Sequence, residues 1–293
     1  MLRWRLLLGV TFVALIAGLL WLDYHANSPG IWLLPLAMLL SLAASQEVLW
    51  LLAARGLAPL PWPVYAGNLL IVGSNIVAVF WPGNPLGTLG WPLAAFALSG
   101  LAVIAGEMHR YERPGAVMER LALGIFALFY VGVLLSFVCQ LRMLGDGAWG
   151  IAAIASLVIV VKACDIGAYT CGRLFGRHKM SPVLSPGKTI EGALGGLLFA
   201  VGGAWFALEW LAPRLIGNST AQGLPWYWIA FGLLVGVTGI AGDLAESLFK
   251  RDVGRKDSSP WMPGFGGVLD LLDSILFAAP VAYLCWLLGL AGR

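Results

Sequence analysis

The chain has 293 residues, of which 60% are hydrophobic and only 11% are charged. Soluble domains carry about 25% charged residues, so this composition excludes an ordinary soluble protein and predicts one that crosses a membrane several times. The net charge is only +3, and no basic stripe with interleaved aromatic residues appears, which argues against a nucleic-acid partner. The four cysteines follow neither a CxxC nor a metal-binding spacing, so they are expected to be small buried hydrophobes.

Long apolar runs follow one another along the chain. The first, Leu6–Leu22, follows Arg3 and Arg5 and lacks a small-x-small cleavage site, so we expect a retained span rather than a signal peptide. The later runs lie at about 31–52, 64–81, 92–106, 120–140, 149–164, 192–211, 226–242 and 268–289. Because a spanning helix needs about 20 residues, the sequence predicts an all-α polytopic membrane protein. About nine transmembrane helices and two polar cytoplasmic loops are expected.

The basic residues test this number of spans. With nine spans and a cytoplasmic N-terminus, fifteen of the eighteen Lys and Arg residues fall on the cytoplasmic side, and only Arg142, Arg214 and Arg293 fall outside. Such an excess follows the positive-inside rule, whereas eight or ten spans would scatter the basic loops over both sides. The polar segments near 165–191 and 243–267 are therefore expected to share the cytoplasmic face.

The first half of the chain carries few polar residues within its apolar runs. Asn68 and Asn75 lie seven residues apart in one run and are expected to bond between helices. Glu47 lies in the middle of another run, where a carboxylate is a functional candidate. An interhelical hydrogen bond or an interfacial position is an equally good interpretation of Glu47. The charged residues from Glu107 to Arg113 are interpreted as a solvated loop.

The first polar segment contains Gly187-Lys188-Thr189, which is similar to the end of a phosphate-binding P-loop. Position 182 is Pro where that motif requires Gly, and no parallel strand is expected before it, so we exclude a P-loop. Lys188 is still a candidate point charge for phosphate, with Ser185 and Thr189 as hydroxyls near a helix start at Ile190. Capping of that helix is the plainer interpretation, and capping and ligand binding are compatible.

The second polar segment, 239–274, contains six of the chain's fifteen carboxylates and four basic residues. Two polar stripes with helical spacing flank a glycine-rich connection: Asp243, Glu246, Ser247 and Lys250 form the first, and Asp270, Asp273 and Ser274 form the second. Carboxylates one turn apart repel each other unless a cation lies between them, and neighbouring Lys and Arg suit phosphate. The segment predicts a metal and phosphate site at a membrane surface. The alternative is a solvated loop with Asp residues at helix starts.

Together the two segments resemble the signatures of the phosphatidate cytidylyltransferases, the CDP-diacylglycerol synthases. In the second segment the matching residues are Ser247, Phe249, Lys250, Arg251, Lys256, Asp257, Ser259, Met262, Pro263, Gly266, Gly267, Val268, Asp270, Leu272 and Asp273. In the first segment they are Asp165, Ala168, Tyr169, Gly172, Arg173, Phe175, Gly176, Ser185, Pro186, Lys188, Thr189, Glu191 and Gly192. Two positions depart, because Phe265 stands where the family usually has His and Leu271 where it usually has Arg. The resemblance covers the C-terminal half from about residue 130.

The resemblance implies the reaction CTP + phosphatidate → CDP-diacylglycerol + diphosphate, a step of phospholipid biosynthesis. It implies Mg²⁺ as cofactor and is compatible with a second, monovalent cation. The expected partners are CTP, phosphatidate, membrane lipid and a second copy in a homodimer, without nucleic acid. The expected location is the inner (cytoplasmic) membrane, with spans at 1–115 and a catalytic membrane domain at 116–293, all in one integrated bundle.

Each candidate residue receives an expected role. Charge neutralisation and in-line positioning of two anions are assigned to Lys188, Lys250, Arg251, Lys256 and Asp257. Substrate contacts are assigned to Asp165, Ser185, Thr189, Ser247, Gly266 and Gly267. Metal binding is assigned to Asp243 and Asp270, with Asp273 as an additional ligand or a supporting group.

Two other classes of protein compete with this interpretation. A CTP-dependent polyprenol kinase or a CDP-archaeol synthase would present a similar apolar bundle and phosphate site. A transporter would be expected to carry polar residues at mid-span and an internal repeat. No repeat is visible in this sequence, and its charges cluster at one face, which favours an enzyme.

Overall fold

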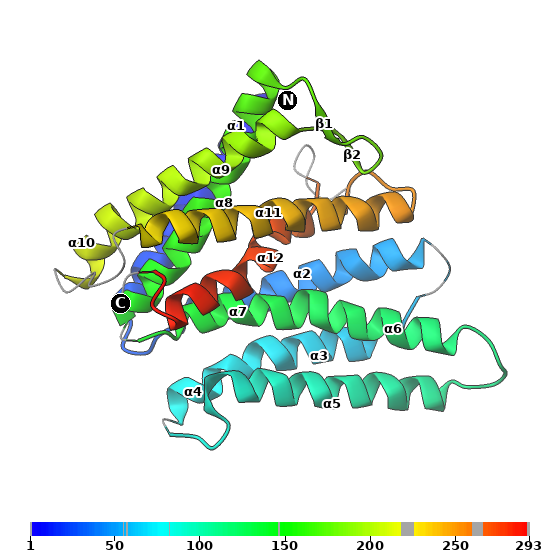
Figure 1. Ribbon diagram of the computed structural model, residues 1–293. Coiled ribbons are helices and arrows are strands. Elements are labelled where there is room, and N and C mark those ends of the chain that lie inside the picture. Colours follow the sequence, from blue (N-terminus) through cyan, green and yellow to red (C-terminus); the bar gives the residue numbers. More distant parts are fainter. Residues whose placement is uncertain are drawn as a thin grey trace. The chain divides into compact units, whose positions relative to one another are not determined.

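The computed structural model describes residues 2–54, 56, 58–81, 83–145, 147–217, 226–259 and 266–291, and within residues 2–13 it describes the side chain of Thr11 alone. Helices make up most of the described chain (Figure 1). In a bilayer the backbone must satisfy its own hydrogen bonds, which a helix does within one segment. The helices are α1 (Leu2–Tyr24), α2 (Leu33–Ala53), α3 (Pro61–Gly73), η1 (Ser74–Ile76), α4 (Val77–Phe80), α5 (Gly87–His109), α6 (Val117–Ala127), η2 (Leu128–Val133), α7 (Leu134–Arg142), α8 (Gly147–Phe175), α9 (Ile190–Trp205), η3 (Phe206–Leu211), α10 (Ala212–Ile216), α11 (Tyr227–Asp252) and α12 (Val268–Leu287). The strands are β1 (Lys179–Ser181) and β2 (Ser185–Thr189).

Eight helical stretches of the described chain are long and apolar enough to cross a membrane. They are Leu33–Ala53, Pro61–Phe80, Gly87–His109, Val117–Arg142, Gly147–Phe175, Ile190–Ile216, Tyr227–Asp252 and Val268–Leu287. Helix α1 covers the first predicted run, and its described part, Ala14–Tyr24, is also apolar. The prediction of an all-α polytopic membrane protein is therefore confirmed.

The helices belong to two compact units that are not continuous in sequence. The first unit comprises Met1–Met143 and Asp252–Leu271, and the second comprises Leu144–Arg251 and Leu272–Arg293. The second polar segment of the sequence is thus divided between the units. The predicted organisation into residues 1–115 and 116–293 concerns function and stays a prediction.

In the first unit, α3 packs between α2 and α5, as Figure 1 shows. Ile71, Val103 and Leu128 are fully or almost fully buried in its apolar core. The Asn68 amide donates to Ser45 Oγ at 2.7 Å, from α3 to α2. The Asn75 amide donates to the hydroxyl of Ser136, on α7, at 3.1 Å. The predicted interhelical hydrogen bonds of both Asn residues are confirmed.

The interpretation of Glu107 as part of a solvated loop is wrong. Helix α5 continues through Glu107, whose side chain is only 1% exposed. Its carboxylate pairs with Arg120 at 2.9 Å and with Arg110 at 3.2 Å. The sequence interpretation failed because a run of charges resembles a loop, although pairing between helices allows such a charge to be buried.

In the second unit, α8 packs along α9, and the hairpin of β1 and β2 connects them (Figure 1). The antiparallel register pairs Lys179 with Thr189 and Ser181 with Ser185. Helix α8 continues to Phe175, about three turns beyond the predicted apolar run. The polar segment near 165–191, which the sequence analysis expected to be a loop, is therefore a helical extension followed by a β-hairpin.

Candidate functional site

Three lysines of the second unit each form an ion pair with a carboxylate. Lys162 and Asp165 pair at 2.9 Å one turn apart on α8, and Lys250 and Glu246 pair at 2.8 Å one turn apart on α11. The third pair joins different elements, because Lys188 Nζ of β2 lies 2.6 Å from Asp243 Oδ2 of α11. This contact brings the Ser-Pro-Gly-Lys-Thr run together with the first carboxylate stripe. The sequence placed both segments on one face of the membrane without predicting the contact.

Asp273 lies buried beside this group of charges, with only 6% of its surface exposed. Its carboxylate accepts a hydrogen bond from the Ser274 amide and lies within the electrostatic reach of Lys162, Asp243 and Glu246. A carboxylate in so little contact with water requires nearby compensation. Asp273 and Asp243 are therefore brought into one neighbourhood, as their assignment to one site requires.

The approach of α12 to α11 depends on a glycine. A Cβ atom at Gly242 would lie 2.6 Å from the carbonyl oxygen of Asp273 and 2.8 Å from Cβ of Phe277. These distances are below any real Cβ contact, so a side chain at this position would push the two helices apart. Gly242, directly before Asp243, thus allows α11 to approach the backbone of Asp273 closely.

Thr189 begins α9 as its N-terminal cap. Its Oγ1 accepts a hydrogen bond from the Gly192 amide at 3.1 Å, and the residue is 6% exposed. Glu191, in the first turn, accepts hydrogen bonds from the Arg177 and His178 amides at 3.0 and 3.2 Å. The capping interpretation of this helix start is confirmed. The predicted substrate contact by Thr189 stays a prediction, as does that of the half-buried Ser185.

The hairpin is also tied to the basic end of α11. Arg251 Nε donates to the Leu184 carbonyl oxygen at 3.2 Å. Ser247 is half-buried on the same helix. The predicted phosphate ligands Lys188, Lys250 and Arg251 therefore all lie in the second unit, on β2 and on the C-terminal turns of α11. Their roles stay predictions.

In the first unit, Asp270 caps the start of its own helix. Its Oδ2 accepts hydrogen bonds from the Gly267 amide at 2.8 Å, the Ser258 amide at 3.2 Å and Ser258 Oγ at 2.5 Å. Gly266 has φ +82°, and a Cβ there would lie 2.2 Å from the same oxygen. The alternative of an Asp at a helix start is thus confirmed for Asp270, and its metal binding stays a prediction.

Glu47 caps the same helix start from α2. Its carboxylate accepts hydrogen bonds from the amides of Val268 and Leu269 at 2.9 and 2.7 Å. Of the three interpretations of Glu47, the interhelical hydrogen bond is thereby confirmed. Sequence reasoning missed the partner, since more than 200 positions separate the two ends of the bond. Two signals were available in the sequence. Glu47 is an isolated carboxylate in an apolar run, and a glycine-rich segment precedes the helix start at Val268.

The remaining signature residues of the first unit differ in exposure, and Ser259 is buried. Lys256 and Asp257 are exposed. The guanidinium of Arg255 lies 3.9 Å from the centre of the Trp50 ring. Of the two departures from the family pattern, Leu271 is half-buried in the first turn of α12, and Phe265 lies outside the described residues.

The donor set in the second unit suits Mg²⁺. Within the described residues no group of three or more His, Cys, Asp or Glu side chains is gathered to hold a metal by itself. Mg²⁺ in enzymes of phosphate chemistry binds one or two carboxylates and completes its octahedron with water and substrate phosphates. Asp243, whose side chain is 41% exposed, and the buried Asp273 offer oxygen ligands of this kind. The residues present therefore fit the ion.

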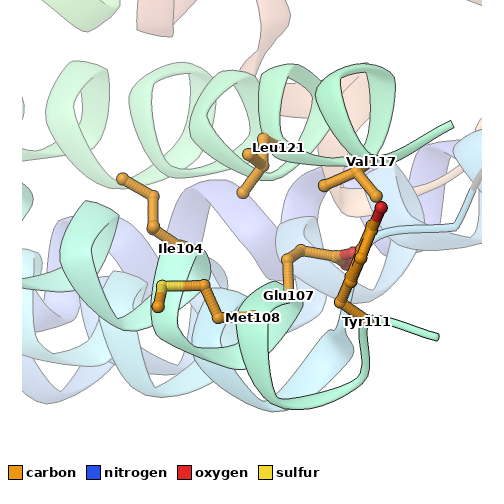
Figure 2. A pocket seen from close by; sticks show the side chains of 6 residues that line it. All are labelled: Ile104, Glu107, Met108, Tyr111, Val117 and Leu121. Carbon is orange, nitrogen blue, oxygen red and sulfur yellow. The ribbon is translucent and has the colours of Figure 1, made fainter. Parts of the chain in front are cut away.

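A cavity of about 300 Å³ lies elsewhere in the first unit, between α5 and α6. Figure 2 shows Glu107 and Tyr111 near each other on one side and Ile104 at the opposite side. The complete lining is Ile104, Glu107, Met108, Tyr111, Val117 and Leu121. None of the predicted site residues lines this cavity, so it takes no part in the site.

Comparison with known proteins decides the family. The model of the cytidylyltransferase family matches residues 3–288. This chain belongs to that family. It is 31% identical over 267 residues to a phosphatidate cytidylyltransferase of Synechocystis, covering 81% of this chain and 82% of the relative. The match to a phosphatidate cytidylyltransferase of Mycobacterium bovis is 29% over 286 residues and covers 93% of this chain and 85% of the relative.

A third relative carries no functional name. It is the uncharacterised protein YnbB of Escherichia coli, 31% identical over 247 residues, covering 84% of this chain and 76% of the relative. The sequence resemblance began at about residue 130, whereas the family model also matches the chain before that residue, from residue 3. The family model therefore covers the N-terminal spans as well as the signature segments.

Proposed function

We propose that this protein is a phosphatidate cytidylyltransferase, which converts CTP and phosphatidate into CDP-diacylglycerol and diphosphate. One observation carries the proposal: the 2.6 Å contact between Lys188 and Asp243 brings together two distant segments that sequence analysis assigned to phosphate and to metal. Membership of the cytidylyltransferase family limits the chemistry to nucleotidyl transfer. The names of the relatives support phosphatidate as the acceptor.

The chemistry is a displacement at phosphorus. A phosphate oxygen of phosphatidate forms a bond to the α-phosphorus of CTP, and the bond from that phosphorus to the β-phosphate oxygen breaks, releasing diphosphate. A phosphate monoester is already anionic at neutral pH, so no strong general base is needed. The two reactants repel each other, and the protein's task is to neutralise their charge and align them. We assign this task to Lys188, Lys250 and Arg251.

Asp243 and Asp273 would hold Mg²⁺, and Asp270 is a further ligand predicted from the sequence. When bound, the ion neutralises phosphate charge and acts as a Lewis acid. The chain's own contribution is to keep Asp243 beside Lys188 and to keep Asp273 buried between charged neighbours. A second, monovalent cation is compatible with this proposal and is assigned no residue.

We further propose an inner-membrane protein with a cytoplasmic N-terminus that acts as a homodimer in membrane lipid. The orientation rests on the fifteen basic residues that a nine-span arrangement places on the cytoplasmic side. This face would give the site access to CTP from the cytoplasm. Phosphatidate would reach it laterally from the bilayer.

The test uses purified full-length protein in detergent with Mg²⁺, phosphatidate and CTP labelled at either the α- or the γ-phosphate. We expect the α-label to enter a lipid that migrates as CDP-diacylglycerol, and the γ-label to leave as diphosphate. Transfer of the γ-label to lipid would instead identify a kinase. Parallel reactions with a polyprenol and with an archaeal ether lipid address the related enzymes, and activity with either lipid alone would contradict the proposal.

A further inference from the structure

We propose that Glu47 is a positioning residue for this reaction: its carboxylate, supplied by α2, holds the first turn of α12 and with it Asp270 and the Gly266-Gly267 segment. The catalytic part of this inference rests on the proposed function, whereas the capping of α12 by Glu47 does not. It assigns a task to the N-terminal spans, in which the sequence showed little chemistry.

The first observation is that both carboxylate oxygens of Glu47 accept hydrogen bonds from backbone amides at the start of α12. Its Oε1 accepts from the Val268 amide at 2.9 Å, and its Oε2 accepts from the Leu269 amide at 2.7 Å. The first amides of a helix have no partner within the helix, and the positive end of the helix dipole favours an anion there. Glu47 is 6% exposed on a membrane-spanning helix, where an unpaired carboxylate would be costly. Cap and carboxylate therefore stabilise each other.

The second observation connects Glu47 to Asp270. Ser258 Oγ lies 3.1 Å from Oε2 of Glu47 and 2.5 Å from Oδ2 of Asp270. A hydroxyl carries one proton, so a single donor serves both carboxylates. Ser258 is completely buried, which fixes this arrangement. A change at Glu47 therefore alters the hydrogen bonds of Asp270 without touching Asp270 itself.

The third observation explains a glycine of the signature. A Cβ atom at Gly267 would lie 2.3 Å from Oε2 of Glu47 and 2.3 Å from Oγ of Ser258. Only glycine leaves room for the Glu47 carboxylate and the Ser258 hydroxyl against the backbone. The sequence alone assigned Gly267 to substrate contact. The packing against Glu47 requires glycine there whether or not substrate touches it.

The experiment compares full-length Glu47→Gln and Glu47→Asp with wild type. Gln keeps one acceptor oxygen but turns an NH₂ group toward a backbone amide, so one capping bond is lost. We expect kcat to fall about 10- to 100-fold, the range for groups that orient metal ligands, with a much smaller change in KM for CTP. Asp keeps the charge on a shorter side chain and should restore part of kcat.

Hydrogen–deuterium exchange gives a readout that does not depend on activity. In Glu47→Gln the amides of 267–269 should exchange faster than in wild type. The matched control is Glu107→Gln, a second buried Glu of the same unit paired with Arg110 and Arg120. It should lower Tm, but leave kcat and the exchange of 267–269 unchanged.

The outcomes separate the possibilities. Unchanged exchange at 267–269 in Glu47→Gln would overturn the capping part. Faster exchange with unchanged kcat, or an equal loss of kcat in Glu107→Gln, would overturn the positioning role and leave a structural one. A wild-type protein that transfers no label from CTP would refute the proposed function, and with it the positioning role, whereas the exchange data would still decide the cap.

Discussion

The three lysine–carboxylate pairs of the second unit differ in how firmly each is held. Lys162 and Asp165 are each 43% exposed, so water screens their pair, and such pairs stabilise a protein by about 0–1 kcal/mol. Lys250 and Glu246 are 12% and 1% exposed, and breaking a pair this buried costs about 3–5 kcal/mol. The pair of Lys188 and Asp243 lies between them, at 21% and 41% exposed. Asp243 is the more exposed member of this pair, and the Nζ atom of Lys188 is itself buried.

The first prediction concerns Lys188. Lys188→Ala removes a cation that we place against a phosphate, and a charge-assisted hydrogen bond contributes about 1.5–3 kcal/mol. We expect kcat/KM to fall about 10-fold to more than 100-fold. Steady-state kinetics with varied CTP and varied phosphatidate would measure the loss. Lys179→Ala, an exposed lysine of the same hairpin, is the control and should retain wild-type kinetics. Equal kinetics for the two variants would show that Lys188 serves only Asp243.

The second prediction concerns the carboxylates. Asp243→Asn keeps size and one carbonyl oxygen but removes the charge that a divalent cation requires. We expect turnover to fall by about 100-fold or more and the Mg²⁺ requirement to rise, while the protein still inserts and purifies. Asp273→Asn is expected to be milder if Asp273 only supports a ligand. Asp270→Asn tests the sequence assignment in the same assay.

The measurement for these variants is CTP turnover across a Mg²⁺ titration, with Tm as a check on folding. Glu119→Gln, at an exposed position of α6, is the control for a carboxylate lost elsewhere. Normal turnover in Asp243→Asn and Asp270→Asn, or activity that survives full chelation, would contradict the metal assignment. Asp270 would then be a helix cap alone, and Asp243 would be only the partner of Lys188.

At the residue scale, the sequence predicted the polar groups better than their partners. Spacing and charge were enough to select Lys188, Asp243 and Asp273, because few charged residues occur in so apolar a chain. They were not enough to pair Lys188 with Asp243, since that contact depends on how β2 is positioned against α11. The capping role of Thr189 was predicted because a cap is local in sequence. The role of Glu47 was not, because its partners are distant.

At the element scale, the crossing of α11 and α12 gives a prediction with an internal control. A Cβ at Gly242 would lie 2.6 Å from the Asp273 carbonyl oxygen, whereas a Cβ at Gly239, one turn earlier, meets its nearest atom at 3.8 Å. Gly242→Ala should therefore overpack the crossing and destabilise the protein by about 1–3 kcal/mol. Gly239→Ala should be tolerated.

Thermal unfolding in detergent measures the stability of both variants, and turnover measures whether the displaced helices matter for activity. We expect Gly242→Ala to lower both Tm and kcat, because the shift moves Asp243 relative to Asp273. A Tm for Gly242→Ala equal to that of Gly239→Ala would mean that the helices separate without cost. The close packing at Gly242 would then make no measurable contribution to the stability of the protein.

Hydropathy predicted where the spans lie but not where the helices end. Helix α8 passes from its apolar run into Asp165 and continues to Phe175, because helix formation depends on the backbone and not on a bilayer. Strand β2 contains Ser-Pro-Gly-Lys-Thr, and Pro and Gly are poor strand residues, so local propensity argued against it. The short hairpin exists because β1 pairs with it, which no local pattern reveals.

At the scale of the whole molecule, the signature is not a module that can be separated from the N-terminal spans. Residues 252–271 belong to the same compact unit as the first 143 residues, and Glu47 caps the helix that this segment begins. The sequence suggested a first half with little chemistry because Glu47 is an isolated carboxylate in an apolar run. The family model, which matches residues 3–288, likewise spans both compact units.

The last prediction tests the orientation of the whole chain by cysteine labelling. Labelling needs an exposed residue on each side of the membrane. Ser258 and Asn218 lie in connections on opposite sides of the nine-span arrangement, but Ser258 is completely buried and Asn218 lies outside the described residues. Lys179 and His25 are exposed. The nine-span arrangement places them on the cytoplasmic side and on the opposite side, respectively. Cys139, Cys164 and Cys285 are buried, and the half-buried Cys171 is replaced by Ala to give a silent background.

Lys179→Cys should react with a membrane-impermeant maleimide only in inside-out vesicles, and His25→Cys only in right-side-out vesicles. The physical reason is the cost of exporting basic loops: with a cytoplasmic N-terminus, any arrangement with an odd number of spans before Lys179 would also move the hairpin, with Arg173, Arg177 and Lys188, away from CTP. The proposed reaction and the orientation therefore depend on each other. Labelling of both cysteines from the same side would contradict the nine-span arrangement, and labelling of Lys179→Cys only from the outside would also remove the site from its nucleotide.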